Sequence, residues 1–460
     1  MPGGFSCVAV VTCALALAGT VYANPLSLTG SSARSIGRAG TGLVSDDGAG
    51  ALVQDPAALA RRDTWRVQVG ASAADDTVHW QSDAADAPVS TDQSGDTVLP
   101  QIAVVGRIGD TVVGAAIMTL GATDRRLRDP FEVGIDQYKH AFDYRFAGVA
   151  GSLRRDALLV GAAHRLGDSV AVGLSLGVSR LKLSETRRMW VGFQNAIGDA
   201  QLGDPLRDLE LSFDGDGYTP SATAGIFVAP EDSPLELALS ATYTKYTHLD
   251  GNVASRTVSL DGPSLQSNGD ASIAIHEPFI ARAGARYVGD RVTAELGGEL
   301  FLVDDRAHET AWVLGGNALA RDAVPANGNA SASTPLASVT SRLSQRTHAA
   351  IRGALDVEMV AGFLWLTGGY AYDVGGTSGD RLSPTFGDLG GHTFALGLEG
   401  TAGGFTYTVG WSRTLTRARH DESVWMLDNP FDGNRAVNAG TYDGSIDQVG
   451  VLVDVELGGH

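Results

Sequence analysis

The sequence predicts an all-β protein: an antiparallel transmembrane β-barrel of about 14 strands with an N-terminal Gly/Ala-rich hatch, or plug, inside it. Three observations support this fold class. Long stretches alternate with period two between large apolar and small residues. Short turns and long polar stretches follow one another along the chain. A segment rich in Gly and Ala precedes the first alternating stretch.

Residues 1–23 are predicted to be a signal peptide that exports the chain. Residues 8–20 form an apolar run, and Val21-Tyr22-Ala23 ends it with a small-x-small cleavage pattern. The alternative is a buried N-terminal helix, but a run of about 13 residues is too short to span a bilayer. Both cysteines, Cys7 and Cys13, lie in this segment, so the exported chain is expected to contain no disulfide.

Composition excludes several classes of function. The formal net charge is −19 and Lys and Arg together number only 34, so a nucleic-acid partner is not expected. Asp214-Gly215-Asp216 and Asp304-Asp305 are acidic pairs, but neither belongs to a complete calcium loop, and no His-x-x-x-His pair suggests zinc. We therefore expect no metal site and no cofactor. No segment after residue 23 has the roughly 18 consecutive apolar residues of a transmembrane helix.

Residues 24–62 are predicted to form the hatch. Small residues such as Gly37 and Gly40 let the backbone fold tightly where large side chains would not fit. The segment closes with Asp55-Pro56-Ala57, just before the first alternating stretch. We expect it to pack inside the barrel, which occupies residues 63–460.

Alternation predicts the strands of the barrel. In residues 169–179, five large apolar residues point one way while Ser, Ala and Gly point the other. An even number is typical of bacterial single-chain barrels, and about 14 strands are expected at residues 64–73, 98–106, 111–120, 156–166, 169–183, 217–229, 235–248, 277–288, 291–303, 347–358, 362–373, 391–401, 405–416 and 445–457. Residues 141–153 also read as a strand; they are assigned to a loop or to an extension of the fourth strand.

Connections of two lengths predict the orientation in the membrane. Arg165-Leu166-Gly167-Asp168 and Gly403-Gly404 are short connectors between strong strands. They alternate with long polar stretches, of which the largest lie at about 184–216, 250–275, 304–346 and 417–445. Outer-membrane barrels place short turns on the periplasmic rim and long loops outside the cell.

The smaller row of each strand distinguishes a membrane barrel from a secreted soluble β-protein. A soluble sandwich exposes its second row to water, so Lys, Glu, Thr and Arg usually fill it. Here that row is largely Gly, Ser, Ala and Thr, with occasional charges such as Arg282, Arg286, Glu295 and Glu299. Small residues suit the concave inner side of a barrel that holds a plug.

The hatch segment ending in Asp55-Pro56-Ala57, followed by a first strand at Thr64, resembles the FadL family of outer-membrane transporters. That family has an N-terminal hatch with an Asn-Pro-Ala motif and a 14-stranded barrel; here Asp55 replaces the Asn. Gly217-Tyr218-Thr219-Pro220 after a long loop, and Pro384-Thr385-Phe386-Gly387-Asp388 before a late strand, are similar to further parts of the family. One departure is the C-terminus, which ends in Gly458-Gly459-His460 rather than an aromatic residue.

The resemblance implies transport of hydrophobic molecules, most of all long-chain fatty acids, across the outer membrane of a Gram-negative cell. It implies that extracellular loops catch the ligand, that an apolar pocket inside the barrel holds it, and that movement of the hatch releases it, sideways into the membrane or into the periplasm. The expected partners are a fatty acid or hydrocarbon, outer-membrane lipid and lipopolysaccharide, and the barrel assembly machinery. A monomer is expected.

Apolar residues in two predicted loops are candidates for ligand capture. They are spaced loosely as on a helix, and packing of the loop against its neighbours is the alternative explanation. Two arginines are candidates for pairing with a carboxylate head group, with lipopolysaccharide or solvent as the alternative. The candidates are Met189, Trp190, Phe193, Ile197, Trp425 and Leu427, with Arg187 and Arg188.

Two other functions remain open from the sequence. The first is a structural or adhesive barrel with a blocked lumen. The second is a lipid-modifying barrel enzyme, for which Gly173-Leu174-Ser175-Leu176-Gly177 matches Gly-x-Ser-x-Gly. That match lies in the middle of an alternating strand, whereas a nucleophile elbow needs a sharp strand-to-helix turn. No catalytic residue, and no enzymatic activity, is therefore expected.

Overall fold

The computed structural model describes residues 32–83, 94–127, 148–190, 208–257, 266–307, 310–315, 338–341, 343, 345–377, 381–421 and 439–457. The predicted signal peptide lies outside this part of the chain, as do four predicted capture residues: Phe193, Ile197, Trp425 and Leu427. Met189 and Trp190 are described in their backbone only.

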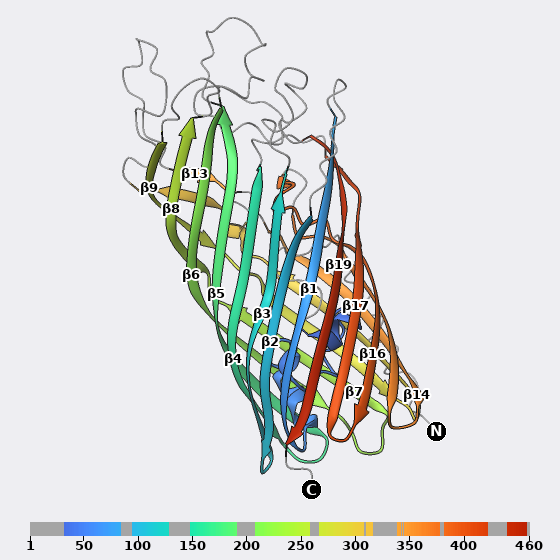
Figure 1. Ribbon diagram of the computed structural model, residues 1–460. Coiled ribbons are helices and arrows are strands. Elements are labelled where there is room, and N and C mark those ends of the chain that lie inside the picture. The colour runs from blue at the N-terminus through green and yellow to red at the C-terminus, as the bar shows by residue number, and fades with distance from the viewer. Residues whose placement is uncertain are drawn as a thin grey trace, which may run out of the picture.

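The strands form one closed antiparallel sheet in which the first and last strands pair (Figure 1). Its strands are β1 (Trp65–Ser82), β2 (Ser94–Ile108), β3 (Thr111–Arg126), β4 (Ala150–Arg165), β5 (Val170–Trp190), β6 (Asp208–Val228), β7 (Leu235–Thr244), β8 (Thr247–Thr257), β9 (Gln266–Ile275), β10 (Phe279–Val288), β11 (Val292–Leu302), β12 (Ala311–Leu314), β13 (Ser338–Thr340), β14 (His348–Val360), β15 (Leu364–Asp373), β16 (Gly391–Ala402), β17 (Phe405–Thr416), β18 (Arg419–Asp421) and β19 (Gly440–Leu457).

Two of the wall strands are bent and therefore divided. β7 pairs with β10 and β8 pairs with β9 in one continuous register, from Thr242 opposite Ile280 to Thr247 opposite Ile275. Pro278, which has no N–H for the ladder, lies at the bend. With these pairs joined and the short β12, β13 and β18 set aside, fourteen wall strands remain, which confirms the predicted fold class.

The strands reach further toward the long-loop end than the sequence predicts. β8 and β9 occupy most of the predicted loop 250–275, and the β5–β6 ladder continues to Trp190 opposite Asp208, inside the predicted loop 184–216. β19 begins at Gly440, inside 417–445, and residues 304–346 contain β12, β13 and the 3-10 helix η6 (Asp305–Ala307). β4 begins at Ala150, so the extension of the fourth strand was the right alternative for residues 150–153, while 141–147 lie outside the described residues.

The outer face of the wall is apolar over the half of the barrel that has short turns. Along β5, Leu174, Leu176 and Val178 are 52%, 53% and 50% exposed, whereas Ser175 and Ser179 between them are each 2% exposed. A soluble sandwich would bury the leucines rather than the serines. The outward apolar row fits a lipid environment, and the short turns mark the periplasmic end.

Above Ser179, the inward row becomes apolar and the outward row becomes charged. Leu181 and Leu183 point inward and are fully buried, while Arg180 and Lys182 point outward and pair with Asp216 and Asp214 across the ladder to β6. This part of the barrel therefore has an apolar interior and a charged exterior. It is built as a water-exposed extension above the membrane.

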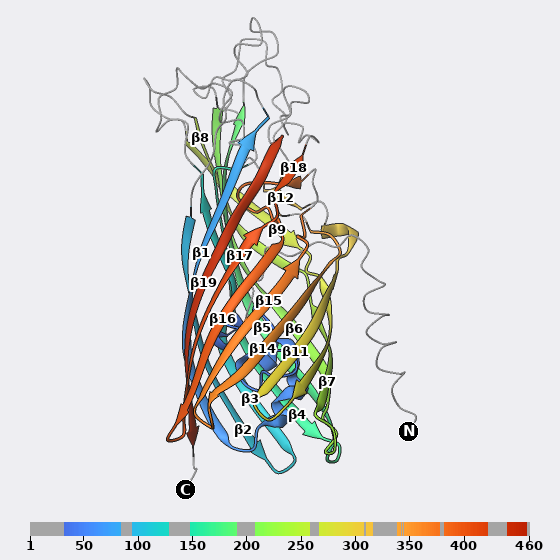
Figure 2. The same cartoon turned by 90° about the vertical axis from the view of Figure 1, so that its right-hand side faces the viewer.

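The N-terminal segment, residues 32–62, lies inside the periplasmic half of the barrel (Figure 2), and we call it the hatch. It contains two short helices, α2 (Ala33–Ile36) and α3 (Ala49–Gln54), and the 3-10 helix η1 (Pro56–Arg61). In the described ranges, no helix is long and apolar enough to cross a bilayer.

Candidate functional site

The first helix of the hatch rests on a floor of wall glycines. Ser32 and Ser35 form a reciprocal capping box at the start of α2. A Cβ on Gly410 of β17 would lie 2.2 Å from the carbonyl oxygen of Ala33, and one on Gly37 would lie 2.8 Å from the Cα of Gly397 in β16. Only glycine permits so close an approach of helix and wall. The Gly-rich inner row is therefore a seat shaped for the hatch.

The Asp55-Pro56-Ala57 motif makes the turn between α3 and η1. Asp55 follows α3 as its C-cap residue, and its side chain caps η1, because its Oδ1 accepts the Ala57 N–H at 3.0 Å. A Cβ on Gly225 of β6 would lie 1.7 Å from that same Oδ1, and one on Gly173 of β5 would lie 2.2 Å from the Ala57 nitrogen. The motif is thus pressed directly against two wall strands.

Asp55 is fully buried, and burial raises its pKa to about 7. Its Oδ2 has no hydrogen-bond partner among the described residues. The positive charge of Arg282 of β10 favours the carboxylate but does not offset its desolvation. The hatch turn therefore carries a carboxyl group that is half protonated near neutral pH.

Gly40, the second predicted hatch glycine, sits at a tight reversal after α2. Ala39 and Gly40 both have positive φ, 52° and 81°, and the Gly40 N–H donates to the Ser35 carbonyl at 2.7 Å. Ala39 is fully buried in this left-handed conformation. The reversal turns the chain away from the glycine floor.

Four hatch arginines clamp the hatch to carboxylates of the wall. Arg38 is bound by Glu295 of β11 at 2.8 Å and by Asp356 of β14. The other contacts are Arg34 with Glu399 at 3.2 Å, Arg62 with Asp454 at 2.9 Å, and Arg61 with Glu236. Buried charges of this kind need a partner, because leaving one unpaired costs several kcal/mol. Five acidic residues of the inner row are thus partners for the hatch.

A cavity of about 130 Å³ lies on the extracellular side of the hatch. Hatch residues Gly40, Leu52 and Gln54 form part of its lining, and so do Ser175 and Gly177 of β5. Its charged lining consists of three arginines and two glutamates, namely Arg155, Arg282, Arg352, Glu277 and Glu299. Leu120, Leu159, Ile280 and Phe301 add apolar surface. The lining as a whole carries one excess positive charge.

The charges around the cavity are held in two groups. Glu299 binds Arg282 at 3.0 Å and Arg352 at 2.8 Å, close to the hatch. On the far side, Arg155 binds Glu277 at 2.7 Å and donates to the hydroxyl of Ser179 at 3.0 Å. The second group lies between the cavity and the apolar interior above it.

Above that ion pair, the barrel interior is a closed apolar core, which we call the upper chamber. Trp312 of β12 is fully buried in it, stacked on Phe213 with ring centroids 5.1 Å apart, and its Nε1–H donates to Glu185 at 3.2 Å. The chamber is formed by Leu153, Leu181, Leu183, Leu209, Leu211, Phe213, Leu249, Val253, Ala271, Ile273, Ile275, Trp312, Leu314, Val339, Leu343 and Phe386.

The wall beside the cavity contains a seam. β2 pairs with β3 only from Gln101 opposite Met118 down to the short turn. Above this point, residues 94–100 of β2 pair with β1 and residues 119–126 of β3 pair with β4, but the two edges form no ladder with each other. The β3–β4 register also shifts at Leu120, which is one of the residues lining the cavity. We call these two unpaired edges the seam.

A family model described as outer membrane protein transport protein (OMPP1/FadL/TodX) matches residues 14–292, more than half of the chain. The chain belongs to this family. Family membership places the protein in the outer membrane, among transporters of hydrophobic compounds. A comparison with curated proteins gave no match.

Solved structures of the FadL family have the same fold. A FadL homologue of Pseudomonas aeruginosa superimposes with a TM-score of 0.71 at 15% identity, over 94% of this chain and 99% of that one. The toluene transporter TodX of P. putida gives 0.67 at 15% identity, over 94% and 100%. The toluene transporter TbuX of Ralstonia pickettii gives 0.64 at 14% identity, over 95% and 100%. Identities this low establish the fold alone.

The predicted capture residues that the structure describes belong to the wall of this FadL-type barrel. Met189 and Trp190 lie in the β5–β6 ladder opposite Leu209 and Asp208, so helical spacing was the wrong interpretation there. Arg188 pairs with Glu210 at 3.0 Å. Arg187 is buried, and its guanidinium lies 5.6 Å from the ring of Phe213. These arginines are components of the extracellular extension.

Ser175 of the Gly-x-Ser-x-Gly match lies in the middle of β5, opposite Gly161 and Thr223. It lines the cavity from a regular strand, and the family consists of transport channels. Among the residues that the structure describes, no group of His, Cys, Asp and Glu could hold a metal ion.

Sequence reasoning missed Arg155, Glu277, Arg352 and the seam. Arg155 and Arg352 are single charges in otherwise ordinary strands, Glu277 lies between β9 and β10, and the partners of all three are far away in the chain. The signal for the seam is also faint: it consists of Pro100, which has no N–H for a ladder, and of polar residues on β3 above Met118.

Proposed function

We propose that this protein takes up amphiphilic hydrophobic molecules, long-chain fatty acids above all, and that the cavity above the hatch receives their head group. The observation that carries the proposal is the order in which three regions follow one another along the barrel axis. An apolar upper chamber is followed by a cavity with excess positive charge and then by the hatch. A fatty acid has the matching order of apolar chain and carboxylate.

The charge of the cavity lining favours an acid over a neutral hydrocarbon. Arg155, Arg282 and Arg352 outnumber Glu277 and Glu299 by one. An arginine guanidinium binds a carboxylate through charge-assisted hydrogen bonds, which are stronger than neutral ones. A carboxylate in the cavity would balance the lining.

The upper chamber favours a long apolar chain. Its lining is built from Leu, Ile, Val, Phe and Trp, and each Å² of apolar surface moved there from water contributes about 25 cal/mol. The Trp312 side chain is fully buried among these residues and is anchored at its indole nitrogen. We infer that an entering chain displaces Trp312, which makes this residue a movable stopper.

Release requires a way past or around the hatch. The four arginine clamps oppose movement of the hatch into the periplasm. The seam lies next to Leu120, at the cavity, and sideways release through it would keep the ligand out of water. We propose that hatch movement and lateral release into the membrane act together.

Binding of matched ligands tests the proposal. The native protein, purified in a mild detergent free of fatty acid, is titrated with oleate and with oleyl alcohol, which differ only in the head group. We expect Arg282→Gln to weaken oleate binding by about 10- to 100-fold, the equivalent of one charge-assisted contact of about 1.5–3 kcal/mol. Binding of oleyl alcohol should change by less than about threefold.

The control is Arg180→Gln. It removes a guanidinium from the outer face of β5, outside the cavity, and should leave both affinities unchanged. Equal losses for the acid and the alcohol in Arg282→Gln would contradict a head-group site. A native protein that binds neither ligand would favour a structural barrel with a blocked lumen.

A neutral hydrocarbon is the second candidate ligand. The stacked Trp312 and Phe213 rings would suit a flat aromatic guest in the upper chamber. The fold neighbours include proteins described as toluene transporters. Toluene that competes with oleyl alcohol but not with oleate would favour this candidate.

We further propose that the protein works as a monomer, that export uses residues 1–23, and that the assembly machinery inserts the barrel. The charged outer wall above the membrane, with pairs such as Arg180 and Asp216, is where contact with lipopolysaccharide is expected.

A further inference from the structure

One arginine spans the seam from the outside. Arg154 belongs to β4 and its side chain lies on the outer face of the wall, 42% exposed. Its Nη1 donates to the backbone carbonyl of Val98 on β2 at 3.1 Å, and its Nη2 donates to the hydroxyl of Thr119 on β3 at 3.0 Å. One guanidinium thus joins two edges that share no ladder.

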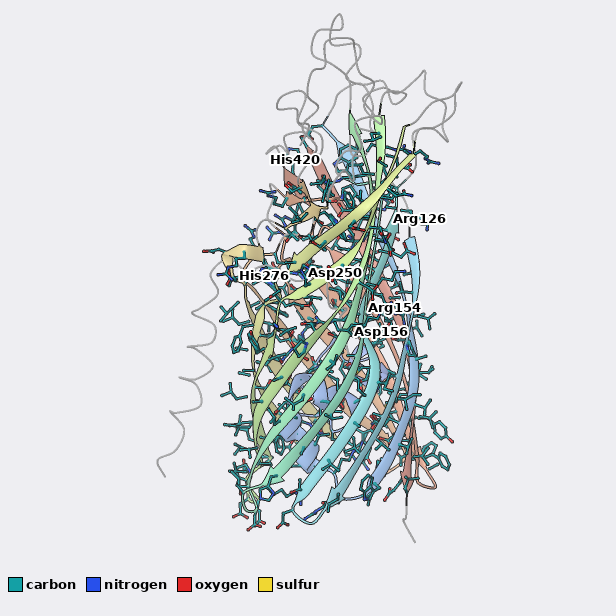
Figure 3. The ribbon with its side chains drawn as sticks, turned by 90° about the vertical axis from the view of Figure 1, so that its left-hand side faces the viewer. Arg126, Arg154, Asp156, Asp250, His276 and His420 are labelled. Carbon is teal, nitrogen blue, oxygen red and sulfur yellow. The ribbon has the colours of Figure 1, made fainter. Side chains whose placement is uncertain are left out.

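A carboxylate holds the guanidinium in this position. Asp156 lies two residues further along β4, on the same face, and accepts from the Arg154 Nε at 3.0 Å. Asp156 also accepts from the Thr119 hydroxyl at 2.6 Å. Figure 3 places Arg154 and Asp156 next to each other on the wall. The fork of Arg154 is therefore aimed across the seam.

The inner side of the seam is closed by different contacts. Asp76 of β1 binds Arg125 of β3 at 2.8 Å and accepts from the Thr123 hydroxyl at 3.1 Å. This ion pair lies nearer the extracellular rim than Leu120. At the level of the cavity, Leu99 of β2 packs with Ala122 of β3 and Ala74 of β1 in a small apolar cluster. Leu99 and Arg154 therefore close the inner and outer sides beside the cavity.

We propose that Arg154 is the latch of a lateral exit at the seam, and that it opens for a carboxylate. The proposal rests on the proposed function, since it presumes a ligand that leaves the cavity sideways. The two acceptors that Arg154 uses at the seam, the Val98 carbonyl on β2 and the Thr119 hydroxyl on β3, are both neutral. A departing carboxylate offers charged oxygens, and charge-assisted hydrogen bonds are roughly twice as strong as neutral ones. The guanidinium exchanges Val98 and Thr119 for the ligand, and the seam loses its outer bond.

The same exchange makes Arg154 a specificity-determining residue. A neutral head group makes no stronger bond than Val98 and Thr119 already make, so it leaves the latch closed. Asp156 keeps the guanidinium anchored to β4 in both states, which allows the latch to re-form after the ligand has left.

Opening of the seam is measured directly by the reactivity of a thiol at Leu99. The chain contains no cysteine beyond residue 13, so Leu99→Cys adds one thiol to the barrel, at a position that is buried in the closed wall. The protein is placed in liposomes and treated with a maleimide dissolved in the lipid. In this background we expect Arg154→Ala to raise the labelling rate about tenfold or more.

Two matched variants separate the latch from a general effect of charge. Arg256→Ala removes an outward arginine, 51% exposed, that pairs with Glu210 of β6 far from the seam, and it should leave labelling unchanged. Arg154→Lys keeps the charge but cannot bridge two strands from one planar fork, so it should label nearly as fast as Arg154→Ala.

Ligand selectivity is read in the same assay. Oleate should accelerate labelling of Leu99→Cys severalfold when Arg154 is present and have no further effect in Arg154→Ala, whereas oleyl alcohol should have no effect in either. Equal labelling in Arg154→Ala and Arg256→Ala would overturn the latch. Acceleration by oleyl alcohol to the same extent would overturn its selectivity. Because thiol reactivity of the ligand-free variants requires no bound ligand, a failure of fatty-acid binding would appear separately, as a lack of response to oleate.

Discussion

The most informative single residue is Asp55. Its carboxyl group caps η1 through Oδ1, while Oδ2 is buried without a partner. Its pKa of about 7 lies above the ordinary value of 3.8, so between these values the native protein holds a proton that the unfolded chain releases. Asp55 therefore weakens the seating of the hatch as the pH rises through this window, by up to about 1.4 kcal/mol per pH unit.

Asp55→Asn should remove this pH dependence. The amide oxygen can still accept the Ala57 N–H, and no charge develops in the buried site. We expect the native protein to show more frequent channel openings in planar bilayers at pH 8 than at pH 5, and Asp55→Asn to show the same low frequency at both. Identical pH profiles for the two proteins would rule out Asp55 as the titrating group.

Arg38 is the most buried of the hatch clamps, at 2% exposure, and binds two carboxylates. Arg38→Met should destabilise the seated hatch by about 3–5 kcal/mol, because Glu295 and Asp356 lose their shared partner. Bilayer conductance should then show frequent openings. Adding Glu295→Gln and Asp356→Asn should restore the closed state.

The matched control is Arg413→Met, which breaks the ion pair of β17 with Asp447 of β19 within the wall. It leaves the pairs of Arg38 intact. If Arg413→Met opened the channel as often as Arg38→Met, the openings would reflect a weakened barrel and not a released hatch.

Among the elements, β5 contributes residues to the hatch seat, to the cavity and to the upper chamber. Its inward row passes Gly173 at the hatch motif, continues with Ser175 and Gly177 at the cavity, and reaches Ser179 below the ion pair of Arg155. Leu181 and Leu183 then line the upper chamber. Small residues occur where the hatch must fit, and large apolar ones where the chamber begins.

The sequence predicted the lower half of such strands well and the upper half poorly, for a physical reason. In the membrane, an apolar outward row alternates with small residues, and period two is obvious. Above it the outward row is charged, and at Asp250-Gly251-Asn252 of β8 no large apolar residue remains to mark a strand. A pattern read only as apolar against small therefore predicted a loop at 250–275. The alternation of charged and apolar residues at Arg180-Leu181-Lys182-Leu183 was the sequence signal that the strand continues beyond the apolar outer row.

The candidate site, too, could be predicted only in part from the sequence. The Asp55-Pro56-Ala57 motif could be recognised because its members are adjacent in the chain. The clamps and the cavity charges could not, because Arg38 and Glu295 are brought together only by strand register, which shifts every contact when it changes by one residue.

At the scale of the whole molecule, the change of the outward row from apolar to charged fixes the level of the membrane surface. Val178 points outward below this change, and Lys182 points outward above it. Spin labels at Val178→Cys and Lys182→Cys should differ sharply in liposomes, the first relaxed by oxygen dissolved in lipid and the second by a water-soluble nickel chelate. Equal access of the chelate to both positions would place the boundary elsewhere.

The pairing of Arg62 with Asp454 has a consequence for the order of assembly. Arg62 precedes the first strand, whereas Asp454 lies on the last one, and β1 and β19 meet along the closure of the barrel. The hatch is therefore made before any wall exists, and the strand that seals the wall carries a carboxylate for it. A barrel that closed without its hatch would leave Asp454 without the closer of its two guanidinium partners, which lies at 2.9 Å against 3.6 Å for Arg66. The ion pair between Arg62 and Asp454 therefore favours closure of the barrel around its hatch over closure of an empty barrel.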